Sequence, residues 1–278
     1  MAQKETLVIG ATGKTGRRVA ERLRARKIPV RFGSRSGKPP FDWADPGTWS
    51  AALRDVGAVY VTYHPDLAAP GASEAIRSFT ALAVKSGVPR LVLLSGRGEP
   101  EAQLCEQIVR DSGAEFTLLR ASWFSQNFSE NYLLDPILAG EVALPIGNVG
   151  EPFIDADDIA DVAVAALTED RHVGQLYELT GPRLWTFAEA IAEIARVTNR
   201  NIRYVQIPAE EYGAAMKELQ LEPEFISLIT YLFAEVLDGR NASTTDGVMR
   251  ALGRPARDFT DYVRETAGTG VWNAGRQS

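Results

Sequence analysis

The chain has 278 residues, 45% hydrophobic and 24% charged, with a formal net charge of −6. This composition is typical of a globular protein, and it lacks the basic surplus of most nucleic-acid-binding proteins. With one cysteine and two histidines, the chain excludes an intrachain disulfide and offers no cluster of the usual metal ligands. No apolar run approaches the roughly 20 residues of a membrane span, and no apolar signal core precedes the first strand. We therefore expect a cytoplasmic protein with no metal and with neither nucleic-acid nor membrane partners.

The most informative stretch is LVIGATGKTG at residues 7–16, where an apolar run meets glycines at positions 10, 13 and 16. A basic segment typical of a helix follows, so the stretch predicts a strand, a tight turn and a helix. Glycines let such a turn bend sharply and let a pyrophosphate approach, which the N–H groups and dipole of the helix then bind. The spacing is G-x-x-G-x-x-G rather than the standard G-x-G-x-x-G. The residues predicted to bind a dinucleotide here are Gly10, Thr12, Gly13, Lys14, Thr15 and Gly16.

Two alternatives exist for this turn. One is a glycine-rich turn that binds no ligand. The other is a nucleoside-triphosphate loop, because Gly13-Lys14-Thr15 has the ending of that motif. That motif requires a glycine five residues before Gly13, where the chain has Val8, so we reject it.

The second predicted strand, at residues 28–32, bears on the choice of cofactor. In a doubly wound sheet its end lies beside the adenosine ribose, where a carboxylate would bind the 2′-hydroxyl of NAD. The chain has Ser34 and Arg35 there instead. An arginine fork suits a 2′-phosphate, so we predict NADP(H) in preference to NAD(H). The alternative is that Arg35 is a solvated loop residue.

Phe41-Asp42-Trp43 predicts a short strand, and a helix is expected at 47–54. Asp42 and Trp43 are expected near the adenine, with simple packing an equally good interpretation of Trp43. Further strands are expected at 57–63, 90–96 and 115–120, alternating with helices. This alternation predicts a Rossmann-type, doubly wound parallel α/β sheet. Ligands bind beyond the carboxyl ends of such strands, so Thr62, Tyr63 and Ser95 are expected to face the cofactor.

Residues 121–128, ASWFSQNF, directly follow the fifth strand. Trp123, Phe124, Asn127 and Phe128 are predicted to line a flat substrate or the nicotinamide, although a helix that packs its aromatic residues into the core is the alternative.

Beyond residue 140 we expect short strands at 141–145, 175–180 and 202–206, and a capping box at Thr186–Glu189 that opens a helix. The acids of residues 155–161 resemble a metal site, but helix capping and surface exposure explain them better.

These motifs together resemble an atypical short-chain dehydrogenase/reductase of the NmrA-like family over nearly the whole length. The resemblance rests on GATGKTG at 10–16, SRS at 34–36, FDW at 41–43, LLS at 93–95, TLLR at 117–120, WF and NF within 123–128, FIDADDIA at 153–160, YELTG at 177–181 and GRPARDF at 253–259. Two branches look similar: the NAD(P)H:quinone and triphenylmethane reductases, and the ergot-alkaloid type of iminium reductases. The resemblance implies a nicotinamide-binding domain at 1–153, whose core sheet can take a strand from beyond 153. A smaller mixed α/β C-terminal lobe at 154–278 would bind the substrate.

One departure from the wider superfamily concerns its proton-donating Tyr-x-x-x-Lys pair. No tyrosine of this chain is followed by lysine four residues later, and Gly98 and Ala102 occupy the two expected positions. A quinone, iminium ion or triarylmethane cation accepts hydride with little help from an acid, whereas a ketone needs one. We therefore expect a reductase of small aromatic or iminium substrates. If an acid is needed, Tyr63 and His64 are the candidates.

Other properties of the protein stay open at this stage. The alternative function is a non-catalytic regulatory protein that senses NAD(P), as some NmrA-like proteins do. The physiological substrate is not indicated. The sequence is compatible with either a monomer or a homodimer.

Overall fold

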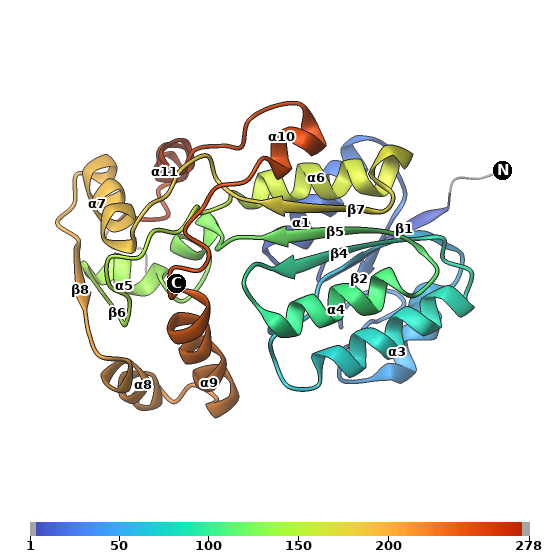
Figure 1. Cartoon of the computed structure of the whole chain (residues 1–278), viewed down its shortest axis with the longest axis horizontal. Coiled ribbons are helices and arrows are strands. Elements are labelled where there is room, and N and C mark those ends of the chain that lie inside the picture. The colour runs from blue at the N-terminus through green and yellow to red at the C-terminus, as the bar shows by residue number, and fades with distance from the viewer. Residues whose placement is uncertain (1–3, 274–278) are drawn as a thin grey trace. The chain divides into compact units, whose positions relative to one another are not determined.

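A computed structural model describes residues 4–273, which divide into two compact units (Figure 1). The first unit holds the described residues up to Ala121, together with Ala156–Leu179 and Asp246–Arg254. The second holds Ser122–Asp155, Thr180–Thr245 and the described residues from Pro255 onward. The units therefore do not follow the continuous boundary expected at residue 153, because the chain returns twice to the first unit.

The first unit is built on a six-stranded parallel sheet, which confirms the predicted Rossmann-type α/β fold. Its order is β2 (Val30–Gly33), β1 (Glu5–Ile9), β3 (Val56–Val61), β4 (Arg90–Gly96), β5 (Glu115–Ala121) and β7 (Gln175–Leu179). The chain leaves β1 toward β2 and later continues from β3 in the opposite direction. The order thus reverses between β1 and β3, which is where sheets of this kind bind ligands.

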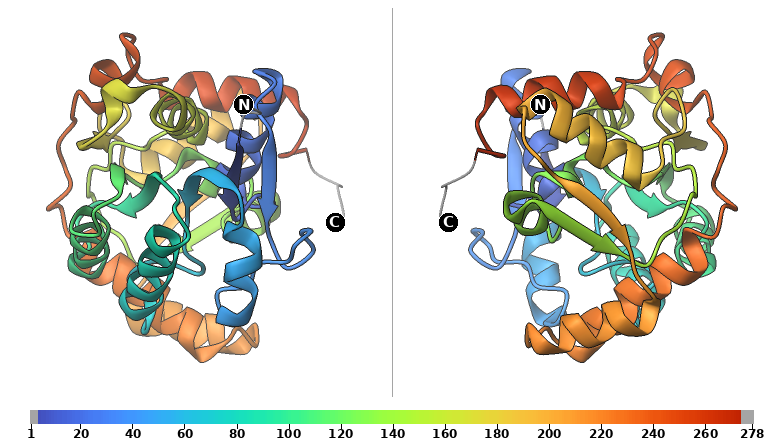
Figure 2. Two further views of the ribbon diagram at one scale, coloured as in Figure 1. Left: turned by 90° about the vertical axis from the view of Figure 1, so that its right-hand side faces the viewer. Right: turned by 90° about the vertical axis from the view of Figure 1, so that its left-hand side faces the viewer.

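Helices cover both faces of this sheet. On one face lie α1 (Lys14–Ala25), α6 (Ala156–Thr168) and α10 (Gly247–Leu252); on the other lie α2 (Trp49–Leu53), α3 (Ala72–Lys85) and α4 (Pro100–Arg110). Figure 2 shows α3 and α4 side by side. Successive strand residues point to opposite faces, so Leu91 and Leu93 join the core beneath α3 and α4 while Val92 faces the other way. Burial on both faces explains the continuous apolar runs of β3 and β4.

The strand predicted at Phe41–Asp42 is wrong. These residues enter a turn closed by a bridge between Asp42 and Asp45. The Asp42 carboxylate accepts a hydrogen bond from the Ala44 N–H (3.0 Å), and the Asp45 carboxylate accepts one from the Gly47 N–H (3.0 Å). Aspartates that bind backbone N–H groups two residues ahead favour turns over strands. A short 3₁₀ turn, Pro46–Thr48, then precedes α2.

The second unit has its own aromatic core, formed by Phe128, Phe153, Phe187 and Phe259. Its elements are a 3₁₀ turn (Ser125–Phe128), α5 (Leu134–Ala139), β6 (Glu141–Leu144), α7 (Phe187–Thr198), β8 (Arg203–Gln206), α8 (Ala209–Glu218), α9 (Pro223–Tyr231), a π-helical turn (Leu232–Val236) and α11 (Phe259–Gly268). Strands β6 and β8 pair in parallel. The capping box is confirmed: Thr186 Oγ1 accepts from the Glu189 N–H at 3.1 Å, and Glu189 accepts from the Thr186 N–H at 2.8 Å.

The acids at the start of α6 bind arginines of the same unit. Arg22 on α1 bridges Asp157 (2.5 Å) and Asp161 (2.6 Å). Arg254 bridges Asp158 (2.7 Å) and Asp161 (2.6 Å), and the Asp158 side chain is fully buried. This arginine–aspartate network, Arg22, Arg254, Asp157, Asp158 and Asp161, ties α1 and the returning segment to α6.

Over residues 4–273 no group of three or more His, Cys, Asp or Glu side chains is arranged to hold a metal ion, and no helix is long and apolar enough to cross a membrane.

We expect Arg254→Met to lower the free energy of unfolding by about 2 kcal/mol, because it removes a cation from the buried Asp158 carboxylate. The matched control is Arg196→Met, which removes an arginine from the exposed pair with Glu193 and should change stability far less. Urea unfolding of both variants measures the difference. Equal losses in the two variants would contradict a structural role for the network.

Candidate functional site

The turn between β1 and α1 is shaped by two glycines. Gly10 has a φ of +67°, and its carbonyl oxygen accepts a hydrogen bond from the Gly13 N–H at 2.8 Å. A Cβ added at Gly16 would lie 2.2 Å from that same oxygen. The backbone of α1 therefore approaches the end of β1 more closely than any side chain at position 16 would allow.

The N-terminus of α1 is suited to an anion. Gly13 is its N-cap residue, no side chain caps the helix, and its first turn contains no acidic residue. Thr12 and Gly13 are exposed, and Lys14 lies at the start of the helix. The helix N–H groups and the positive end of its dipole thus lie at the carboxyl edge of the sheet, beside the point where the strand order reverses. Thr15 differs from its neighbours, because it is buried against the Tyr60 hydroxyl.

At the end of β2, Arg35 is exposed and Ser34 is half-buried. The Ser34 hydroxyl lies 3.3 Å from that of Ser36. Within residues 4–273, no carboxylate forms an ion pair with the Arg35 guanidinium. The strand end therefore carries an available cation rather than an acid.

Trp43 and Thr62 brace the end of β3. The Trp43 indole N–H donates to the Thr62 carbonyl oxygen (2.9 Å), and its ring packs 5.0 Å from Tyr63 and 5.1 Å from Phe41, measured between ring centroids. The Thr62 hydroxyl donates to the Ile9 carbonyl oxygen at 3.0 Å. These contacts give Trp43 a packing role in this structure, and they join the end of β3 to β1.

Tyr63 and His64 follow β3 directly. His64 is exposed, and Tyr63 is half-buried. Burial, with smaller contributions from Cys105 and Glu74, raises the pKa of the Tyr63 phenol. A phenol of raised pKa is a poor proton donor at neutral pH.

Ser95, at the end of β4, belongs to an internal polar network. Its hydroxyl donates to Glu106 at 2.7 Å, and the same carboxylate accepts from the Arg120 guanidinium at 2.9 Å. Arg120 also binds Glu178 at 2.8 Å. Glu106 is only 2% exposed, so the predicted cofactor contact of Ser95 competes with a buried structural bond.

Sequence reasoning missed two carboxyl groups in this unit, Asp66 after β3 and Glu99 after β4. They share a hydrogen bond at the carboxyl edge of the sheet. Glu99 precedes Pro100 at the start of α4. An acid in that position looks in sequence like an ordinary helix-start residue, and the pairing with Asp66 depends on the parallel order of the strands.

In the second unit, the four predicted substrate contacts separate into two groups. Trp123, Phe124 and Asn127 are partly exposed, and Trp123 stacks on Phe233 with centroids 5.5 Å apart. Phe128 is fully buried among the core phenylalanines. The core-packing alternative therefore describes Phe128, and we carry only the other three forward as substrate contacts.

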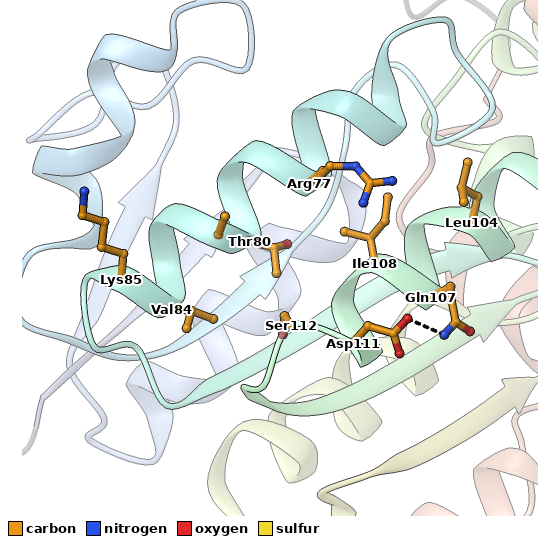
Figure 3. A pocket seen from close by; sticks show the side chains of 10 residues that line it. Arg77, Thr80, Val84, Lys85, Leu104, Gln107, Ile108, Asp111 and Ser112 are labelled. Carbon is orange, nitrogen blue, oxygen red and sulfur yellow. Dashed lines mark hydrogen bonds between the residues drawn. The ribbon is translucent and has the colours of Figure 1, made fainter.

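A groove of about 530 Å³ lies between α3 and α4 (Figure 3). Its lining includes Arg77, Val84 and Lys85 of α3, Leu104 of α4 and Asp111 directly after α4. Each helix begins near the carboxyl edge of the sheet, and the groove runs from the second turn of each helix to the end of that helix, away from this edge. It is separate from the glycine turn.

No family model matches the chain. It is 33% identical over 286 residues to a (4-alkanoyl-5-oxo-2,5-dihydrofuran-3-yl)methyl phosphate reductase of Streptomyces griseus, with 94% of this chain and 97% of the relative covered. It is 30% identical to the NAD(P)H azoreductase of Xenophilus azovorans, with 94% and 97% covered. It is also 30% identical to the agroclavine dehydrogenase of Claviceps fusiformis, with 96% and 98% covered. The chain belongs to the NmrA-like family of atypical short-chain dehydrogenases/reductases, and it is an oxidoreductase.

The fold of this NmrA-like oxidoreductase is also that of a solved reductase. The structure of Citrobacter sp. triphenylmethane reductase complexed with NADP(H) superposes with a TM-score of 0.74 at 18% identity. The superposition covers 95% of this chain and 99% of the other. The residues of the glycine turn fit a dinucleotide, because the turn brings the uncapped start of α1 close to the end of β1, where its N–H groups can meet a pyrophosphate.

We expect Gly16→Ala to weaken nucleotide binding and to lower the free energy of unfolding of this oxidoreductase by about 2 to 3 kcal/mol, because its methyl group would collide with a backbone oxygen. Gly213→Ala is the control, since a Cβ at this position of α8 meets nothing within 4 Å. Thermal unfolding and calorimetric titration with NADPH measure both effects. If the two variants behaved alike, the tight β1–α1 contact would not matter for binding.

Proposed function

We propose that the protein is an NADPH-dependent reductase that transfers hydride to an electron-poor small organic molecule, such as a quinone, an iminium ion or a related aromatic compound. The observation that carries this proposal is the uncapped N-terminus of α1 beneath the glycine turn. It offers backbone N–H groups to a pyrophosphate at the reversal of the strand order. When bound, the reduced nicotinamide would supply the hydride.

The preference for NADPH rests on the end of β2. Arg35 is exposed and without a carboxylate partner over the described residues, and Ser34 and Ser36 lie beside it. A guanidinium with hydroxyl groups nearby suits a 2′-phosphate, whereas a 2′-hydroxyl calls for an acceptor. Glycines 10, 13 and 16, with Thr12 and Lys14, would hold the pyrophosphate.

The kind of substrate follows from what the start of α4 lacks. Gly98 and Ala102 stand where the superfamily has its tyrosine and lysine, and Ala102 is fully buried. Without that pair, acceptors that are already electron-poor are favoured over simple ketones. The names of the relatives agree, since an azo compound and an ergot alkaloid are among their stated substrates. Trp123, Phe124 and Asn127 are proposed to contact a flat substrate of this kind.

The function is tested by following the loss of reduced-nicotinamide absorbance with four acceptors: a quinone, a cyclic iminium ion, a triarylmethane dye and a plain ketone. We expect turnover of at least one of the first three, with the ketone inert. Turnover of the ketone alone would contradict the proposed substrate class. Saturable NADPH binding without turnover of any acceptor would contradict the proposed reductase activity.

Arg35→Ala should weaken NADPH binding by about 10-fold or more, because it removes a charge-assisted hydrogen bond to the 2′-phosphate. NADH binding should stay nearly unchanged. Lys38→Ala, an exposed change in the same loop, is the control and should affect the two cofactors equally. Titration by nucleotide fluorescence measures the four affinities. An unaltered NADPH preference in Arg35→Ala would contradict the assignment.

A further inference from the structure

The loops that follow β3 and β4 bring two acidic side chains together within the first unit. The carboxyl groups of Asp66 and Glu99 share a hydrogen bond, and Asp66 also accepts one from the Ala68 N–H at 2.8 Å. Glu99 is only 7% exposed. The charged groups that act on this Asp66–Glu99 pair are themselves acidic, namely Glu101 and Glu106 of α4. The pair is therefore a pair of acids rather than an ion pair, and the charges that act on it most strongly are negative.

Glu99 is buried and Asp66 is half-buried, and a charge on both of two adjacent carboxyl groups is unfavourable. Burial raises the pKa of Glu99 well above its ordinary value, and the negative charge of Asp66 adds to the effect. Burial raises the pKa of Asp66 as well, but its bonds to the Ala68 N–H and to Glu99 favour the ionised form. The stronger upward shift of the Glu99 pKa favours a shared proton on Glu99.

The Glu99 carboxyl group is held against the last residue of β4. A Cβ added at Gly96 would lie 2.1 Å from Glu99 Oε1 and 2.3 Å from Oε2, so the carboxyl group occupies the space of the missing side chain. Glu99 Oε2 is buried, and among residues 4–273 it has no hydrogen-bond partner. A buried oxygen without a partner is uncommon in folded proteins, and a catalytic role is one explanation for it.

The order of the strands places this oxygen on the nicotinamide side of the fold. The adenosine ribose of a bound dinucleotide lies at the end of β2, and the molecule crosses the sheet where the order reverses, between β1 and β3. Its other half therefore lies toward the carboxyl ends of β3 and β4. Asp66 and Glu99 follow those two strands.

We propose that Glu99 is the proton donor of the reduction and that Asp66 accepts a hydrogen bond from the protonated Glu99 carboxyl group. This role rests on the proposed reductase function. Hydride from the reduced nicotinamide adds to the acceptor, and the displaced electron pair moves to an oxygen or nitrogen of the acceptor. A new O–H or N–H bond forms there as the Glu99 O–H bond breaks, and the Glu99 carboxylate then takes a proton from water.

This role separates two classes of acceptor. A quinone or an azo compound gains a negative charge with the hydride and needs a proton. A triarylmethane cation is neutralised by the hydride alone and needs none. Glu99 should therefore matter for the first class only, whereas a residue needed only for folding or cofactor binding would affect both.

The kinetic experiment compares the wild-type protein, Glu99→Gln and the control Glu101→Gln, each with NADPH and either a quinone or a triarylmethane dye. We expect Glu99→Gln to lower kcat for the quinone about 100-fold or more, with the rate for the dye within about threefold of wild type. Glu101 acts on the pair electrostatically, so a second control is Asp111→Asn, an exposed acid directly after the same helix, which should leave both rates nearly unchanged. If Glu99→Gln reduces the quinone as fast as wild type does, the donor role is wrong while the proposed function stands. If the wild type reduces neither of these acceptors nor the cyclic iminium ion, the proposed function and the donor role both fail.

A second measurement requires neither cofactor nor turnover. Infrared spectroscopy of the protein alone should show the C=O band of a protonated carboxyl group at neutral pH, and Glu99→Gln should remove it. The pH dependence of the free energy of unfolding gives the same information. In the unfolded chain Glu99 loses its proton above its ordinary pKa of about 4.3, whereas in the folded protein it keeps the proton to higher pH. The free energy of unfolding of the wild type therefore declines as the pH rises. Glu99→Gln should lack this decline. A spectrum without the protonated band, or one that Glu99→Gln leaves unchanged, would overturn the proposal.

Discussion

The first unit depends on a single close contact between two backbone segments. The start of α1 lies against the Gly10 carbonyl oxygen at a distance that only a hydrogen atom at position 16 permits. This contact fixes the helix directly behind the end of β1, and it directs the uncapped N–H groups of α1 to the carboxyl edge of the sheet. Trp43 and Thr62 then join the neighbouring strand end to the same point. The proposed binding of a pyrophosphate at this site therefore rests on main-chain geometry.

Arginine side chains maintain this geometry from two sides. On one face of the sheet, the arginine–aspartate network ties α1 to α6. On the other, Arg120 joins Glu106 of α4 to Glu178 of β7 across β5. Both groups of ion pairs are partly or fully buried. Removal of one partner would therefore leave an unpaired charge in a poorly solvated environment. Acids that look in sequence like a metal site or a solvated surface here serve to position helices.

The sequence predicts the sheet and its glycine turn well because both depend on local patterns. Apolar runs buried on both faces, their alternation with amphipathic helices, and the Thr186–Glu189 capping box are all visible within a few neighbouring residues. The prediction fails where a residue's role is decided by distant partners. Phe128 is predicted to line a cleft, but Phe153 and Phe259 pack against it in the core. Ser95 is predicted to face the cofactor, but its hydroxyl donates a hydrogen bond to Glu106. Asp66 and Glu99 are 33 positions apart, and only the parallel order of β3 and β4 brings them together.

The division of the first unit into three segments has a consequence for how the molecule is made. Gly247 packs its backbone against Glu178 of β7, with no space for a Cβ, and Arg254 supplies a cation to the buried Asp158. On the ribosome, β1 to β5 emerge long before these residues do. The first unit therefore cannot reach its final form during synthesis of its own N-terminal region. Its packing against α6 and β7 stays incomplete until translation has passed Arg254.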